Sequence, residues 1–537
     1  MDMIITNGNL VTLDNNSPIA EAAGIHQGKI VMIGSSGDIM AHKGSKTEVI
    51  DLKGKTVVPG FNDSHVHLLN YGLSLQRLDC SNARSIDDII SLAQDKLKDE
   101  SIPAGEWILG RGWNSVLLKE GRDLTRYDLD QISLHHPICL TRACEHIISV
   151  NSKALELASI TEQTPQPPGG HFDLGENGEP LGIFRENARF LIFDTLPIPT
   201  LKEIKQRIQR ASKVASGFGI TSVHSDDFGA IYPQSPSTVI QAYQELCHTR
   251  QLPLRIYQQC LLPDMKQLDE FLKKGWRTGM GDNLYRIGPL KLLTDGSLGA
   301  RTAFLSQPYT DDPSTSGIAV YTQEELFQLV LKAHQNKMQI VLHAIGDQAM
   351  ERCFEAFQKV QHICYRSDPR FGIIHLQITT KALIREFARS GTIAFAEPIC
   401  LYNDLHMAEN RVGEKRVKES YQYRRLMDSG VPVCLSTDCP VDNLNPMKNL
   451  HAAVTRQDEN GFPSGGWMPE QKLSVHQALK AYTLGSAYAS YEEAVKGSLE
   501  PGKLADMVVL SNNPYQVPPE NLKDIEIEMT MMNGRFV

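Results

Sequence analysis

The chain of 537 residues exceeds a typical single domain, so we expect one large domain with appendages or two domains. Its 54 basic and 63 acidic residues give a formal net charge of -9, and no long basic run is present, which excludes nucleic acid as the expected partner. No stretch approaches the about 18 apolar residues of a membrane span, and the first residues do not resemble a signal peptide, so we expect a soluble cytoplasmic protein without membrane association.

Both ends of the chain contain short runs in which apolar and polar residues alternate. Residues 1–58 include MIITNGNLVTLD, AAGIHQGKIVMIG and EVIDLKGKTVVPG, which turn at Gly, Asn and Asp. Residues 497–537 show the same alternation in GSLEPGKLADMVVLSNNP and IEIEMTMMNGRFV. We predict that the two segments form one composite β-sandwich domain, which would bring both termini together.

Between these ends, short apolar runs alternate with helical patterns. Eight runs have the length and composition of buried strands, namely VVPGFNDSHVH, GITSVHSDD, LRIYQQCLL, IGPLKLLTDG, QIVLHAIGD, FGIIHLQ, GTIAFAEP and VPVCLSTDCPV. Eight buried strands alternating with helices are typical of a (β/α)8 TIM barrel, in which the chemistry lies at the carboxyl ends of the strands. We therefore predict an α/β fold with such a barrel over residues 59–496.

One interval interrupts this alternation. The first predicted strand is separated from the second by the segment from about Tyr71 to Pro199. Because this segment is too long for a loop, we predict an inserted subdomain over residues 72–199 that covers the barrel mouth.

The first predicted strand ends in the pair His65 and His67. Residues two apart on a strand point to the same side, so both imidazoles can reach one cation while Val66 turns into the core. Two solvated loop histidines are the alternative interpretation. Further residues of metal-binding type stand at the ends of other predicted strands, namely Lys291, His343, His375 and Asp438.

Each of these residues also has a structural interpretation when it is taken alone. A single histidine at a strand end is more often a buried residue bonded to a backbone carbonyl, which applies to His343 and His375. Asp438 could cap a helix ahead of Pro440. As a ligand close to the attacking water, Asp438 could instead take the proton of the water and pass it to a leaving nitrogen.

Lys291 needs a separate argument, because an ammonium group repels cations. Buried beside metal ions, its amine is pushed toward the neutral form and can capture carbon dioxide, giving a carbamate whose oxygens bridge two metals. The alternative is an ion pair with Asp295. Neutral imidazole and carboxylate ligands suit zinc and other first-row divalent ions.

At this point the chain resembles a known family. The motifs VVPGFNDSHVHL, KLLTDGSLGARTAF, VLHAIGD, IIHLQ, LSTDCPVDNLNP and GSLEPGKLADMVVL occur in order. Together they resemble the amidohydrolase superfamily, in the branch of N-substituted formamide deformylases and related metal-dependent hydrolases (the amidohydrolase 3 family). The run RDLTRYDLDQISLHHPICLTRACEHIISVNSKAL in the insertion is similar to a characteristic block of that branch.

The resemblance implies a barrel with a composite β-sandwich and one or two divalent ions, most simply Zn. In the binuclear form His65, His67 and Asp438 would hold the first ion, and His343 and His375 the second. Carboxylated Lys291 would bridge them. A hydroxide between the ions would attack the carbonyl carbon of the substrate, and Asp438, as the catalytic residue, would transfer the proton.

The chain departs from the pattern of the branch at a few positions. Glu145 stands before His146, where a small residue is expected. Glu397 stands where a neutral amide is more usual. Thr437 before Asp438 also differs from the usual residue, but this difference should matter little to the metal. If both carboxylates line the site, a cationic or amine-bearing substrate is favoured; the alternative is that arginines pair with them. Candidate substrate contacts, each of which also has a structural alternative, are Trp113, His146, Glu186, Arg301 and Glu397.

The leading functional hypothesis is hydrolysis of a non-peptide carbon–nitrogen bond in a small molecule, most simply an N-acyl or N-formyl amine. A mononuclear deaminase would use His65, His67, His343 and Asp438 but would not need Lys291. The presence of Lys291 therefore disfavours a deaminase. A non-catalytic regulatory protein that kept the barrel is a third alternative, although such proteins commonly lose ligands and here every expected ligand is present. The sequence leaves the oligomeric state open, with a homodimer as one option.

Overall fold

The computed structural model describes residues 1–100, 102–142, 146–231 and 234–537. By its internal contacts the chain separates into two compact units, one made of Met1–Tyr71 with Leu201–Val537 and the other of Gly72–Thr200. Within the described residues no helix has the length and apolar character needed to span a membrane.

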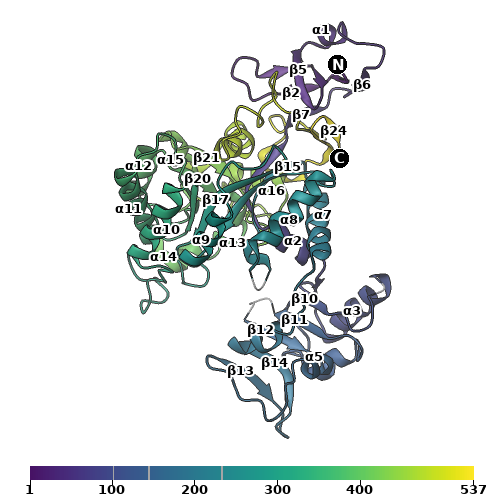
Figure 1. The fold of residues 1–537 in the computed structure, drawn as a ribbon, viewed down its shortest axis with the longest axis vertical. Helices are drawn as coiled ribbons and strands as arrows, with labels where there is room; N and C mark the ends of the chain where they lie inside the picture. The colour runs from purple at the N-terminus through teal and green to yellow at the C-terminus, as the bar shows by residue number, and fades with distance from the viewer. Residues whose placement is uncertain (101, 143–145, 232–233) are drawn as a thin grey trace. The chain divides into compact units, whose positions relative to one another are not determined.

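Eight parallel strands form the central sheet of the first unit, in the order β21-β20-β19-β18-β17-β16-β15-β8. Figure 1 labels β15, β17, β20 and β21 of this sheet. The eight strands are β8 (Phe61–Val66), β15 (Ile220–Asp226), β16 (Arg255–Leu261), β17 (Tyr285–Leu293), β18 (Ile340–Ala344), β19 (Gly372–His375), β20 (Ile393–Ala396) and β21 (Val433–Leu435). Hydrogen bonds also connect the end of β8 with the segment that follows β21, since the backbone nitrogen of Asp438 donates to the carbonyl of His65 (2.9 Å) and that of His67 to the carbonyl of Cys439 (2.8 Å). The predicted eight-stranded barrel is therefore confirmed.

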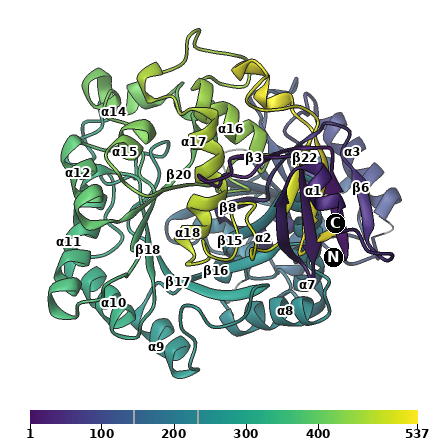
Figure 2. The ribbon, with the colours of Figure 1, turned by 90° about the horizontal axis from the view of Figure 1, so that it is seen from above.

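Helices follow the strands and surround the sheet, as the view in Figure 2 shows for α8 to α12. The helices of this unit are α1 (Ser36–Met40), α2 (Leu68–Ser74, which crosses the boundary between the units), α7 (Leu201–Gly217), α8 (Pro236–His248), α9 (Met265–Lys273), α10 (Gln323–Gln335), α11 (Asp347–Ile363), α12 (Lys381–Ser390), α13 (Leu401–Asp404), α14 (Ala408–Val417), α15 (Tyr423–Asp428), α16 (Pro446–Thr455), α17 (Val475–Lys480) and α18 (Ser486–Ala489).

The helix α12 illustrates how the local sequence sets these elements. It begins after Thr380, whose hydroxyl oxygen accepts a hydrogen bond from the backbone nitrogen of Leu383, and it ends at Gly391 with φ 65°. Leu383, Ile384 and Phe387 are buried on one face. The glycine stop allows the chain to turn directly into β20.

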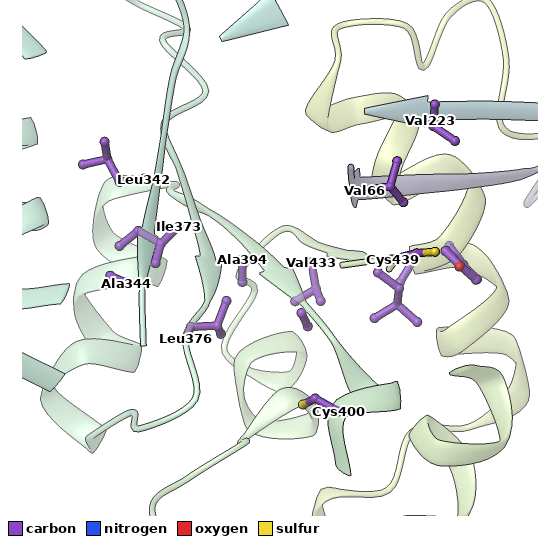
Figure 3. Close-up of a cluster of buried hydrophobic side chains, with 14 of the residues drawn as sticks. Val66, Val223, Leu342, Ala344, Ile373, Leu376, Ala394, Cys400, Val433 and Cys439 are labelled. Atoms are coloured by element: carbon purple, nitrogen blue, oxygen red, sulfur yellow. The ribbon is translucent and has the colours of Figure 1, made fainter. Parts of the chain in front are cut away.

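Apolar residues of the strands and helices form one extended buried cluster around the barrel. Figure 3 shows part of it, with Val66, Val223, Leu342, Ile373 and Val433 among the labelled side chains. A second, smaller cluster contains Val341, Ile374, Ile393, Phe395, Cys434 and Ala489. Because neighbouring strand residues point to opposite faces, the two clusters mark the outer and the inner face of the same strands.

Strands from both ends of the chain meet in one six-stranded sheet of the order β24-β23-β22-β7-β2-β3. Its strands are β24 (Arg535–Phe536), β23 (Ile527–Met532), β22 (Met507–Leu510), β7 (Thr56–Pro59), β2 (Asn9–Val11) and β3 (Ile19–Ala20). A four-stranded sheet consists of β5 (Lys29–Gly34), β4 (Ala22–His26), β1 (Met3–Thr6) and β6 (Glu48–Asp51). Side chains of both sheets share a buried core that includes Ile5, Ile25, Leu10 and Val509.

The second unit has its own six-stranded sheet and its own buried apolar clusters. The strands, in sheet order, are β13 (Gly170–Leu174), β14 (Pro180–Glu186), β12 (Ile147–Val150), β11 (Ile138–Arg142), β10 (Ile108–Trp113) and β9 (Leu78–Asp79). Its helices are α3 (Ile86–Glu100), α4 (Arg126–Asp130), α5 (Ser152–Leu157) and α6 (Phe190–Phe193).

Candidate metal centre

The alternation of the barrel strands determines which side chains face the interior at their carboxyl ends. Val66, Leu292 and Leu342 lie in the outer apolar cluster. The residues next to them in the chain therefore point to the inner face. This geometry brings together His65 of β8, His67 directly after β8, Lys291 of β17 and His343 of β18.

His375 reaches the same place by a different route. Ile373 lies in the outer cluster and Ile374 in the inner one, so strict alternation would turn His375 outward. Its backbone instead has φ 76°, in the left-handed region. Its ring centroid lies 4.3 Å from that of His343 and 5.7 Å from that of His65. A left-handed histidine costs about 1–3 kcal/mol, a strain that is typical of functional sites.

Asp438 lies between the first two histidines. Its Oδ1 is 3.3 Å from Nε2 of His65 and 3.2 Å from Nε2 of His67. Among the described residues, one group of at least three potential metal ligands has its ligand atoms within 4.8 Å of one another: His65, His375, Glu397 and Asp438. His67 and Asp438 retain side-chain exposures of 25% and 14%, so solvent reaches this edge of the group.

In three of the site histidines, Nδ1 has a partner that fixes the orientation of the ring. Nδ1 of His65 lies 2.7 Å from Oε1 of Gln259, and Nδ1 of His67 donates to the backbone carbonyl of Asp226 (2.8 Å). Nδ1 of His375 lies 2.5 Å from Oε2 of Glu397. Such contacts set the tautomer of a histidine ligand and raise its basicity.

Burial keeps most of these groups in the form that binds cations. It lowers the pKa of His65 to about 3 and that of His375 well below its usual range. It also lowers the pKa of Lys291, although nearby acidic groups oppose it. His67 differs, because the hydrogen bond and the charge of Asp438 outweigh burial and raise its pKa to about 9. Neutral imidazoles are the form that a divalent ion requires.

The side chains of Lys291 and Asp226 have no hydrogen-bond partner in the part of the chain that the structure describes. Nζ of Lys291 and both carboxylate oxygens of Asp226 are buried, and none of them is paired within the described residues. Asp295, the alternative partner of Lys291, accepts hydrogen bonds from the backbone nitrogens of Phe304 and Gly346 instead. Buried polar groups are normally bonded, so an unpartnered amine and an unpartnered carboxylate beside histidines fit a site in which metal ions take the place of hydrogen-bond partners.

The candidate substrate contacts lie in varied surroundings. Trp113 is fully buried and its Nε1 donates to the carbonyl of Leu140 (3.0 Å). His146 and Glu186 form an exposed pair with 2.9 Å between Nδ1 and Oε2. Arg301 pairs with Asp311. Glu145 lies outside the described residues.

Glu397 is placed at the metal group rather than beside an arginine. It forms its closest side-chain contact with His375, and Ser436 donates to its Oε1 at 3.3 Å. Sequence reasoning did not single out Gln259 and Asp226, which contact the first two histidines. The signal that could have found them is the presence of polar residues near the ends of otherwise apolar runs, in IYQQCLL and SVHSDD.

Exchanging the carboxylate of Glu397 for an amide is expected to weaken metal binding. Glu397→Gln keeps the shape of the side chain but replaces the carboxyl group that contacts Nδ1 of His375, so we expect roughly 10- to 100-fold lower metal affinity. Competition with a chromophoric chelator measures this affinity. Glu409→Gln, at an exposed position of α14, is the control. An affinity within twofold of the unchanged protein would contradict a supporting role for Glu397.

The fold and this group of residues together define a class: a parallel barrel with histidines and carboxylates at the carboxyl ends of its strands is typical of metal-dependent hydrolases. The model of the amidohydrolase family (Amidohydro_3) matches residues 48–537. The chain therefore belongs to the amidohydrolase family, and the resemblance found in the sequence is confirmed.

Relatives and solved structures agree with this assignment. The protein named "Putative amidohydrolase YtcJ" of Bacillus subtilis is 32% identical over 540 residues, covering 100% of this chain and 99% of the relative. The N-substituted formamide deformylase of Arthrobacter pascens is 26% identical, with coverages of 99% and 97%. A metal-dependent hydrolase from Pyrococcus horikoshii, described as uncharacterized, has a TM-score of 0.80 and 29% identity, with coverages of 96% and 99%. The chain is thus a metal-dependent hydrolase of this superfamily, as predicted.

Proposed function

We propose that this enzyme hydrolyses the carbon–nitrogen bond of an N-acyl or N-formyl amine at a binuclear centre. The observation that carries the proposal is the buried amine of Lys291, which has no partner in the described part of the chain although it lies among histidines and acids. A mononuclear deaminase would have no use for an amine there. The similarity to a relative named as a formamide deformylase supports the same substrate type.

Different residues would hold the two ions. His65, His67 and Asp438 would hold one ion, and His343 and His375 the other. Lys291, converted to a carbamate, would bridge them, which gives its unpartnered nitrogen a role. When bound, divalent ions, which we propose to be zinc, would polarise the scissile carbonyl and make water nucleophilic at neutral pH.

Asp438 would transfer the proton of the reaction. The carboxylate accepts a proton from the attacking water and then donates it to the nitrogen of the leaving amine, which could not depart as an anion. Its position suits this task, because one oxygen lies between the two histidines while the side chain stays partly open to solvent. Gln259 and the carbonyl of Asp226 would keep the imidazoles oriented during this transfer.

Removal of the metal is expected to abolish hydrolysis reversibly. The purified enzyme is treated with a chelator, dialysed, and assayed with a panel of N-formyl and N-acetyl amines by measuring the released amine. Activity should fall by at least about 100-fold and return on addition of a divalent ion. In His65→Asn the added ion should not restore it. Amine release that survives this substitution would refute the site, and ammonia release from amino-substituted rings would favour the deaminase alternative.

A further inference from the structure

A second polar group lies at the same end of the barrel, in the segments that follow β19, β20 and β21. These are the strands whose ends carry His375, Glu397 and Asp438. The group, here called the acceptor cluster, consists of Gln377, Asn403, Asp404 and Asp442. Gln377 follows His375 by two residues, Asn403 and Asp404 end α13, and Asp442 follows Asp438 by four residues.

Hydrogen bonds connect the members of the acceptor cluster in two pairs. Nε2 of Gln377 donates to Oδ2 of Asp404 (3.0 Å), which also accepts from the hydroxyl of Tyr421 (2.8 Å). Nδ2 of Asn403 donates to Oδ1 of Asp442 (3.1 Å). Hydrogen bonds from neutral donors are therefore the contacts of these two carboxylates, and neither forms an ion pair with a lysine or arginine within the described residues.

Gln377 gives independent evidence for a ligand-binding site at this place. Its side chain is 7% exposed, and its Oε1 has no hydrogen-bond partner in the described residues. The amide nitrogen of the same side chain donates to Oδ2 of Asp404. An unpartnered buried acceptor in a side chain that is bonded to a carboxylate calls for a donor.

The charges around the cluster specify the kind of donor. Burial, followed by the charges of Asp404 and Asp438, raises the pKa of Asp442 to about 7. Burial also raises the pKa of Asp404 to about 6. No cation is among the causes of either pKa shift. Because the charge of Asp404 raises the pKa of Asp442, the two carboxylates repel each other. A positively charged donor would relieve that repulsion and satisfy the open acceptors.

An ammonium group fits this description better than a metal ion. Asp404 and Asp442 are not members of the group of potential metal ligands identified among the described residues. An ammonium group carries three donors and can bond carboxylate and amide oxygens at once. Asp442 is only partly buried, so a ligand can approach it from solvent.

We propose that the acceptor cluster binds an ammonium group of the substrate, so that the preferred substrates are N-acyl amines with a second, cationic amine, such as mono-N-acylated diamines. The inference rests on the proposed function and narrows it to a substrate class. The acyl group would lie at the metal centre, and the cluster would hold the far end of the leaving amine. An N-acyl amino acid, which carries a carboxylate in place of the ammonium group, would be repelled.

Matched substrates test this inference with the holoenzyme. Each set of N-formyl or N-acetyl amines has one chain length and ends in an ammonium, a methyl or a carboxylate group. The kcat/KM of the ammonium compound should exceed that of the methyl compound by about 10- to 100-fold. Asp442→Asn should bring this ratio close to one. Asp428→Asn removes an exposed carboxylate of α15 that pairs with Arg424, and it should leave the ratio unchanged.

The possible results separate the inference from the function on which it rests. Equal rates for the ammonium and methyl compounds, or an unchanged ratio in Asp442→Asn, would overturn the inference while amide hydrolysis stands. If no amide is cleaved, the proposed function is wrong. Calorimetry with 1,5-diaminopentane then still tests the cluster, since binding should be at least tenfold weaker in Asp442→Asn. If that variant does not fold, Gln377→Met, which removes the open acceptor, replaces it in both measurements.

Discussion

Replacing Asp438 by asparagine is expected to lower kcat by roughly 10²- to 10⁴-fold, the range that a general acid–base residue contributes. Asparagine has the same shape and can still contact His65 and His67, but it can no longer take a proton from water and deliver it to the leaving nitrogen. Steady-state hydrolysis of an N-formyl amine measures the effect. Metal content, determined on the same sample, distinguishes a lost proton transfer from a lost ligand.

The control for this substitution is Asp428→Asn, which changes the net charge equally but lies on the exposed surface of α15. It should retain the full kcat. If Asp438→Asn contains the normal amount of metal and keeps more than a tenth of the activity, another group carries the proton. If it loses both metal and activity, its role as a ligand dominates the result.

Much of the barrel could be predicted from the sequence, because each strand is a short buried run and each run ends in a recognisable turn. The inward positions of His65, Lys291 and His343 follow from the two-residue period of a strand once the apolar neighbours are assigned to the outer face. These predictions depend only on local sequence and on the fact that parallel strands end at one edge. They did not require knowledge of any contact between distant residues.

Other parts of the site depend on features that the two-residue period of a strand does not determine. The side chain of His375 faces inward because its backbone is left-handed. Alternation along the strand would have placed it on the outer face. The contact between Glu397 and His375 depends on the pairing of β19 with β20 and on their exact register. The acceptor cluster is formed by three separate segments, so its members are far apart in the chain and no spacing links Gln377 to Asp404. Such contacts become visible only in three dimensions.

Replacing Lys291 by methionine is expected to change function and stability in opposite directions. Methionine fills a similar volume but cannot form a carbamate, so the protein should bind one metal equivalent instead of two and lose most of its hydrolytic activity. Elemental analysis measures the stoichiometry. Loading the unchanged protein with ¹³C-labelled bicarbonate should give a carbamate signal in its NMR spectrum, and the variant should lack that signal.

The metal-free proteins provide the second half of this test. In the absence of metal the amine of Lys291 is buried without a hydrogen-bond partner in the described residues, and burial alone lowers its pKa. Removing an unsatisfied buried group of this kind stabilises a protein by about 1–3 kcal/mol. The free energy of unfolding of metal-free Lys291→Met, measured with urea, should therefore exceed that of the unchanged chain. A lysine that is retained for metal binding is expected to lower the stability of the protein when the metals are absent. A variant that is less stable and still binds two metals would therefore mean that Lys291 contributes to packing and does not bridge the ions.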